Sequence, residues 1–138
     1  MDIPQLEINE WMDTLKVYQR TSLEVLIKNN SEEEAAKLWL SANGASITKQ
    51  FGGNSNSEPF WDRFLSEFND FVCGDEKYSK EREQLTSQAP IANTLFVGVI
   101  SGSIGATLGF AASLLAPAVA ILLFLIGKVG INAYCKNE

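Results

Sequence analysis

Residues 91–111 read IANTLFVGVISGSIGATLGFA, and residues 114–134 read LLAPAVAILLFLIGKVGINAY. The chain has no charged residue from Gln84 to Gly127. This uncharged segment contains the first stretch and most of the second, which continues past Lys128 to Tyr134. That segment is about twice the ~20 residues that a helix needs to cross a hydrocarbon layer ~30 Å thick. We therefore expect a hairpin of two apolar helices with its turn at Ala116 and Pro117. Alternatively, Pro117 lies in the first turn of the second helix, a position that suits proline.

Two other interpretations of the apolar segment stay open at this point. A shallow re-entrant hairpin would enter the bilayer without crossing it, and a water-soluble protein would bury the same helices in an oligomer or beneath other subunits. All three interpretations place these residues out of water, since a helix that is apolar on every side belongs in a core or in a membrane.

The charged residues are concentrated in the first part of the chain. Beyond Glu83 the only charged residues are Lys128, Lys136 and Glu138, so the formal net charge of −6 belongs almost entirely to residues 1–83. An acidic domain is a poor partner for nucleic acid, because phosphate binding requires clustered lysine and arginine. We therefore expect no nucleic-acid partner.

The residue types needed for catalysis or metal binding are scarce. The chain has no histidine, and its two cysteines, Cys73 and Cys135, are too far apart for a zinc-binding motif. The absence of histidine removes the commonest general base and metal ligand. Because no pair of carboxylates forms an acid–base set either, we expect no enzymatic activity, no metal and no cofactor.

Residues 1–83 predict a small acidic domain made of helices. The apolar periodicity and the cap residues place these helices near residues 9–29, 32–42, 59–73 and 75–88, the last of them leading into the apolar segment. Ser31 and Glu34 form a capping-box pattern at the start of the second helix. The expected fold is all-α: an N-terminal helical domain, 1–83, followed by a two-helix transmembrane hairpin within 84–138.

Aromatic residues recur on one side of the predicted N-terminal helices. They are Trp11, Trp39, Trp61, Phe60, Phe64, Phe68 and Phe71. A domain of about 80 residues needs such side chains to build its core. We interpret them as core residues, with a groove for a partner or small ligand as the alternative.

Small residues recur at four-residue intervals in the first apolar helix. One series is Gly98, Gly102 and Ala106, and the other is Ser101, Gly105, Gly109 and Ser113. In lipid, helices associate through close packing of such small-residue faces. We expect one face to pack the hairpin and the other to form a homo-oligomer; packing within the hairpin alone is the alternative.

The ends of the hairpin suggest a topology. Lys128 lies near the end of the second arm, where a lysine can extend to the membrane interface; a pore-lining or subunit-contact role is the alternative. Lys128 and Lys136 favour cytoplasmic termini under the positive-inside rule. The chain starts MDIPQLEINEW, without the basic and apolar regions of a secretory signal. We expect a multi-pass protein of the inner (cytoplasmic) membrane, with reduced thiols and Cys135 either inert or S-acylated.

The glycine-rich helix followed by LLAPAVAILLFLIG is similar in style to the hydrophobic helical hairpin of pore-forming colicins. It also resembles the two-helix membrane modules of small bacterial effectors in anti-phage and other conflict systems. The resemblance covers about a third of the chain and is one of architecture. It implies that a cytosolic sensing or recruiting domain controls a segment that disrupts the membrane.

Two functions follow from these observations. The first is a membrane-disrupting or channel-forming effector of bacterial defence or toxin systems, which oligomerises in the bilayer under the control of the helical domain. The alternative is a membrane-anchored interaction module or adaptor that recruits a cytosolic partner. The expected partners are the lipid bilayer, further copies of the chain and a cytosolic protein or regulator. Because a simple anchor needs only bulk hydrophobicity, the small-residue faces favour the effector.

Overall fold

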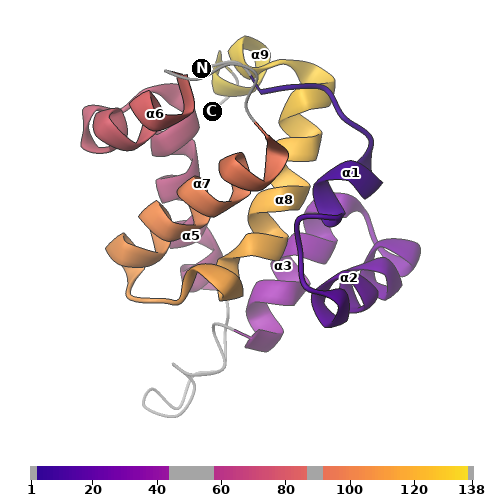
Figure 1. The fold of residues 1–138 in the computed structure, drawn as a ribbon. Helices are drawn as coiled ribbons and strands as arrows, with labels where there is room; N and C mark the ends of the chain where they lie inside the picture. The colour runs from indigo at the N-terminus through magenta and orange to yellow at the C-terminus, as the bar shows by residue number, and fades with distance from the viewer. Residues whose placement is uncertain (1–2, 44–57, 87–91, 137–138) are drawn as a thin grey trace.

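The computed structural model describes residues 3–43, 58–86 and 92–136, and every regular element within these ranges is a helix (Figure 1). The predicted all-α class is therefore confirmed. The helices are α1 (Ile8–Met12), α2 (Val17–Asn29), α3 (Glu32–Asn43), α5 (Glu58–Cys73), the 3₁₀ helix η1 (Glu76–Tyr78), α6 (Ser79–Thr86), α7 (Asn93–Leu108), α8 (Ala112–Val129) and α9 (Ile131–Lys136).

The first predicted helix is divided into two, so the prediction of one helix over 9–29 was wrong. The Thr14 hydroxyl donates to the carbonyl of Trp11 at 2.7 Å, which ends α1 with a local turn. The backbone N–H of Lys16 then donates to Gln19 Oε1 at 3.2 Å and starts α2. The resulting bend lets α1 and α2 cover two different parts of the molecule (Figure 1).

The other N-terminal helices lie close to their predicted positions. Ser31 Oγ accepts a hydrogen bond from the backbone N–H of Glu34 at 3.2 Å, as the capping pattern predicted for α3. The last predicted helix is divided into η1 and α6, and its predicted residues 87–88 lie outside the described ranges. The Asp75 carboxylate accepts from the backbone N–H of Lys77 at 2.9 Å and starts η1.

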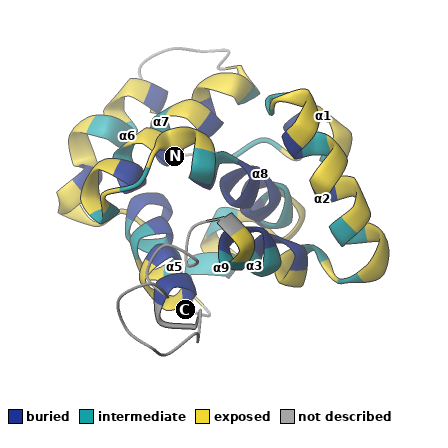
Figure 2. Cartoon of the chain, turned by 90° about the horizontal axis from the view of Figure 1, so that it is seen from below, coloured by how far each residue is buried: buried dark blue, intermediate teal, exposed yellow. Residues whose placement is uncertain are grey.

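Helix α8 lies at the centre of the molecule, and the other helices surround it (Figure 2). Its most extensive contacts are with α3 and α7, followed by α1. The predicted core aromatics Trp11, Trp39, Trp61, Phe60, Phe64, Phe68 and Phe71 are all buried, in one hydrophobic core shared with α7 and α8. The interpretation of the aromatic residues as core is therefore confirmed.

The apolar segment forms two consecutive helices, α7 and α8. Within the described ranges, α8 alone is long and apolar enough to cross a membrane, since α7 is shorter. A core helix of a water-soluble protein meets the same criteria of length and composition, and 50% of α8 is buried in this fold. The structure thus contains an apolar helical hairpin of which only one arm has the length of a membrane span.

The N-terminal segment crosses α8 at Gly127. A Cβ atom at this position would lie 2.7 Å from the carbonyl oxygen of Pro4, so only glycine allows the two backbones to approach this closely. The segment before α1 therefore lies directly against the C-terminal part of α8.

Candidate functional site

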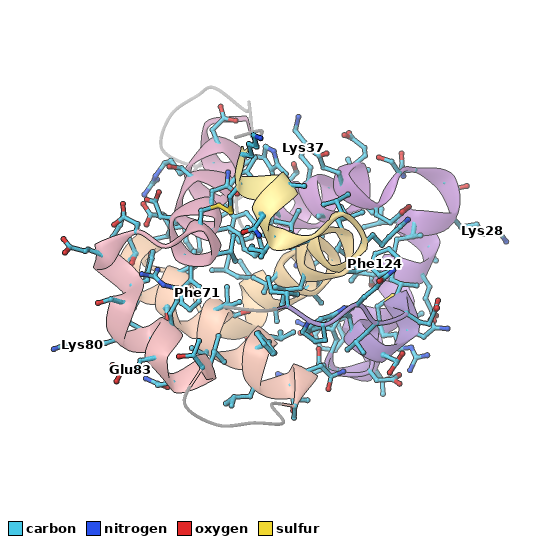
Figure 3. The ribbon with its side chains drawn as sticks, turned by 90° about the horizontal axis from the view of Figure 1, so that it is seen from above. Lys28, Lys37, Phe71, Lys80, Glu83 and Phe124 are labelled. Carbon is cyan, nitrogen blue, oxygen red and sulfur yellow. A yellow bond between two sulfur atoms is a disulfide. The ribbon has the colours of Figure 1, made fainter. Side chains whose placement is uncertain are left out.

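The candidate site is helix α8 with the contacts that hold it among the other helices. Half of the residues of α8 are fully buried: Leu115, Pro117, Ala118, Val119, Ala120, Ile121, Leu122, Leu123 and Ile126. Charged side chains such as Lys28, Lys80 and Glu83 project outward, whereas Phe124 lies among the helices (Figure 3). Among the described helices, the most apolar one is therefore partly enclosed by the polar N-terminal helices on one side and by the apolar helix α7 on another.

Pro117 lies inside α8, so the prediction of a hairpin turn at Ala116 and Pro117 was wrong. The turn is at Gly109–Ala111, where Gly109 adopts a left-handed conformation (φ +84°) and its N–H donates to the carbonyl of Gly105 at 2.8 Å. Proline lacks the N–H that would reach the carbonyl four residues earlier, and in α8 that carbonyl belongs to Ser113.

Two side chains from the N-terminal helices donate to carbonyls of α8 near this proline, and one of them, Gln19, compensates for the missing N–H. Gln19 Nε2, on α2, donates to the carbonyl of Ser113 at 2.7 Å. Trp39 Nε1, on α3, donates to the carbonyl of Leu114 at 2.9 Å. Because the Gln19 side chain is buried and its Oε1 accepts from Lys16, this residue links the start of α2 to the weakened turn of α8.

The two small-residue series of α7 have different environments. Ser101 and Gly105 are buried, and a Cβ atom on Gly105 would lie 2.4 Å from the carbonyl oxygen of Phe110. Gly109 is not part of a helix face, because it ends α7. Gly98, Gly102 and Ala106 are exposed, and at both glycines an added Cβ would meet no atom within 4 Å. Ser101 and Gly105 therefore face the protein, whereas Gly98, Gly102 and Ala106 face solvent; Ser113, the last member of the second series, is exposed and belongs to α8.

A polar cluster ties α7 to the helices that precede it. The Tyr78 hydroxyl donates to Glu67 Oε1 at 2.8 Å and lies 2.9 Å from Thr107 Oγ1 of α7. Lys77 Nζ lies 2.9 Å from Glu67 Oε1 and 3.1 Å from Asp70 Oδ2. Thr107 is thus joined through one tyrosine to an ion-pair network on α5 and η1.

The charges of this cluster shift its pKa values. Partial burial raises the pKa of the Glu67 carboxyl, but the hydrogen bonds from Lys77 and Tyr78 outweigh burial, so the pKa lies below the ordinary 4.5. Burial, together with the neighbouring Glu67, raises the pKa of Tyr78 to about 12. Glu67 is therefore ionised and Tyr78 neutral at pH 7, which is the pairing that the hydrogen bond requires.

We expect the tie between α7 and α5 to weaken in acid. The pKa of Glu67 is lower in the folded protein than the ordinary value of 4.5. The ionised Glu67 side chain therefore stabilises the fold fully above about pH 4.5, and this stabilisation is lost as the pH falls through the pKa of the folded state. Glu67→Gln should reduce the free energy of unfolding by about 1 kcal/mol at pH 7, and by much less at pH 3. Urea denaturation at both pH values measures this loss, with Glu76→Gln, an exposed glutamate on the neighbouring 3₁₀ helix η1, as the control. An equal loss of unfolding free energy at both pH values would contradict the assignment of Glu67 as the ionised acceptor of this cluster.

A disulfide joins Cys73, the last residue of α5, to Cys135 in α9, with 5.6 Å between the Cα atoms (Figure 3). The expectation of two separate reduced thiols was therefore wrong for this structure. The Tyr134 hydroxyl also lies within hydrogen-bonding distance of Asn69 Oδ1, and its ring contacts Phe68 edge-on at 6.5 Å. These contacts fix α9, and with it the end of α8, to α5.

Lys128 lies in the last turn of α8 and is exposed. Its Nζ atom lies 5.2 Å from the centre of the Phe124 ring, in the range of a cation–π contact. A positive charge at this end of a helix also interacts favourably with the helix dipole.

The residues that the sequence analysis did not identify are Gln19, Glu67 and Tyr78, together with the donor role of Trp39 and the pairing of the two cysteines. One signal was present for Gln19, since a proline in an apolar helix leaves a carbonyl that needs a donor. No group of three or more potential metal ligands occurs among residues 3–43, 58–86 and 92–136. Comparison with protein-family models, curated proteins and solved structures gives no match.

Proposed function

We propose that this protein is a membrane-disrupting or channel-forming effector, and that the described fold is its shielded form. In the active form, α7 and α8 enter the bilayer and several copies associate through Gly98, Gly102 and Ala106. The observation that carries the proposal is the solvent-facing side of α7, which is exposed but has no charged residue.

An exposed helix face in a water-soluble protein normally carries charged side chains. Helix α5 follows this rule, since its exposed positions include Asp62 and Arg63. On α7 the exposed positions carry no charge: they are the threonines Thr94 and Thr107, the small residues Gly98, Gly102 and Ala106, and Leu95, which is 37% exposed. Water-soluble packing gives no reason for this composition, whereas helix association in lipid does.

The buried hydroxyl of Ser101 also supports a second packing arrangement for α7. Its Oγ atom has no hydrogen-bond partner within the part of the chain that the structure describes. A buried hydroxyl without a partner is unfavourable, and serine hydroxyls between membrane helices find partners on the neighbouring helix. We propose that Ser101 does so in the assembled form.

The contacts around α8 are compatible with its release into lipid. Most of its partners are apolar side chains, which lipid tails can replace. The two polar contacts, from Gln19 and Trp39, involve its first turns near Gly109–Ala111. Eighteen residues extend about 27 Å at ~1.5 Å per residue, so α8 is close to the length of a span, with Lys128 at one end.

A membrane-anchored interaction module is the alternative function, and one observation favours it. On α2 the apolar residues Val17, Tyr18 and Val25 are 82%, 62% and 58% exposed, an arrangement typical of a binding surface. The α2 surface can equally bind a regulator of the effector. The two functions differ in their effect on lipid, because an anchor leaves vesicles intact.

We expect the purified chain to release a self-quenched dye from phosphatidylethanolamine–phosphatidylglycerol vesicles. Gly98→Leu/Gly102→Leu should reduce the rate at least tenfold, because leucine side chains prevent close helix approach. Gly98→Ala/Gly102→Ala is the matched control: it raises helix propensity in the same direction but keeps the face small. Gly105 is unsuitable for this test, since any side chain there collides with Phe110.

The assay is run between pH 7 and pH 4, with and without a reductant. If the unmodified chain releases no dye under any of these conditions, the proposed function is wrong. If it releases dye and both double variants match it, the function stands and the small-residue face has no role in it. Thermal unfolding of the three proteins shows whether any difference arises from folding.

A further inference from the structure

We propose that the Cys73–Cys135 disulfide is a redox latch, which holds the C-terminal half of α8 in the shielded fold until a dithiol reductant opens it. The consequence for membranes rests on the proposed function. The opening itself is a property of the fold and can be measured without lipid.

The position of the disulfide gives it control over α8. Cys73 ends α5, and Cys135 lies in α9, which follows α8 after the single residue Gly130. The chain between the two cysteines contains η1, α6, α7 and α8, so the bond closes a loop around the whole apolar hairpin. While the bond is intact, the end of α8 cannot move away from α5.

The other contacts of α9 are weak. The helix has six residues, none of them buried, and an isolated helix of this length is unstable in water. Gly130 separates it from α8 with a φ of +91°, so α9 gains no stability as a continuation of α8. Apart from the disulfide, α9 is held by the contacts of Tyr134 with Asn69 and Phe68 and by the packing of the half-buried Ile131 and Tyr134 on the core.

The surface beside the latch is indented. A partly open pocket of about 390 Å³ lies between α3, α5, α8 and α9, lined by Leu65, Leu122, Leu125, Val129 and Tyr134 together with Glu33 and Lys128. Side chains that line an open pocket contact solvent on one side, so movement of α9 breaks fewer van der Waals contacts here than it would in a closed core.

The disulfide is accessible to a reductant because Cys73 is exposed and Cys135 half-buried. One thiolate of the dithiol attacks Cys73 Sγ, forming a mixed disulfide while the S–S bond breaks and Cys135 leaves as a thiolate that takes up a proton. The second thiolate of the reductant then attacks the mixed disulfide and releases Cys73. The protein gains two electrons and two protons, and the dithiol becomes a disulfide.

This chemistry makes the shielded form responsive to its compartment. Dithiol reductants are characteristic of the cytosol, where disulfides do not persist. An oxidised chain remains closed, and a chain exposed to a reducing compartment loses the covalent tie on α9 and can release the end of α8. The latch therefore couples exposure of the apolar hairpin to redox state.

Hydrogen exchange of the full chain, oxidised or treated with dithiothreitol, tests the latch. At labelling times too short for exchange by global unfolding, we expect exchange in residues 124–136 to rise at least tenfold on reduction, while α3 stays protected. Cys73→Ser/Cys135→Ser should show the same raised exchange with no response to dithiothreitol. Unchanged exchange in residues 124–136 overturns the proposal. An equal rise throughout the chain also overturns it, because the disulfide would then stabilise the whole fold and not the end of α8 in particular.

Dye release from the vesicles described above separates this proposal from the proposed function. Release at least tenfold faster after reduction supports the latch. Equal release by oxidised and reduced chains overturns the latch and leaves the function standing. Raised exchange in residues 124–136 without any release supports the latch and contradicts the function.

Discussion

Replacing both cysteines by serine is expected to lower the free energy of unfolding by about 4 kcal/mol. The two residues are 62 positions apart, and a cross-link over such a loop removes much of the conformational freedom of the unfolded chain. The native fold should persist, because domains of this size have stabilities of about 5–15 kcal/mol. Urea denaturation of the oxidised chain and of Cys73→Ser/Cys135→Ser measures the difference.

Two controls accompany this measurement. Dithiothreitol should lower the stability of the unmodified chain to the value of the double variant and should leave the variant unchanged. Cys73→Ser alone should match the double variant in monomeric samples, since either substitution removes the cross-link. A difference below about 1 kcal/mol would show that the two sulfur atoms are not bonded in solution, and it would also remove the basis for the latch.

The helical class and most helices could be predicted because their signals are local. The capping pattern of Ser31 and Glu34 specifies the start of α3, and the phenylalanine stripe of α5 specifies its buried face. The break between α1 and α2 depends on hydrogen bonds of Thr14 and Lys16, which compete weakly with a continuing helix. Such a balance is decided by tertiary packing and is hard to read from the sequence.

The candidate site was less predictable because its contacts join residues far apart in the chain. The small-residue series identified two faces of α7, but only the fold shows that Ser101 and Gly105 face inward while Gly98 and Gly102 face solvent. The cysteine pairing depends on α9 lying against α5, for which the sequence contains no spacing signal. The turn was misplaced because the compensating donor for Pro117 lies in α2.

These long-range contacts give the shielded form its specificity. Apolar side chains around α8 do not distinguish protein from lipid, since both environments exclude water. Directional contacts do distinguish them: the donors from Gln19 and Trp39, the Thr107 cluster and the disulfide all require the packing of the described fold. In the proposed function, the stability of this small set of contacts decides when α7 and α8 leave the shielded form and enter the bilayer.

Removing both donors to α8, in Gln19→Leu/Trp39→Phe, is expected to lower the free energy of unfolding by about 4 kcal/mol, or about 2 kcal/mol for each substitution. Gln19→Leu leaves the Ser113 carbonyl without a donor, and Trp39→Phe removes the side-chain donor to the Leu114 carbonyl and leaves a gap where the indole packs, both in a partly buried setting. A substitution of Pro117 distinguishes the two donors. Pro117→Ala restores an N–H that can reach the carbonyl of Ser113, which is the acceptor of Gln19 and not of Trp39.

Gln19→Leu should therefore be less costly in the Pro117→Ala background, with a coupling free energy of about 1 kcal/mol, whereas Trp39→Phe should cost nearly the same in both backgrounds. Urea denaturation of the two double-mutant cycles measures both couplings. Equal couplings for Gln19 and Trp39 would contradict the assignment of Gln19 as the compensating donor. Because Gln19→Leu weakens only the shielded form, the proposed function also requires it to accelerate dye release, and slower release by a folded variant would count against that function.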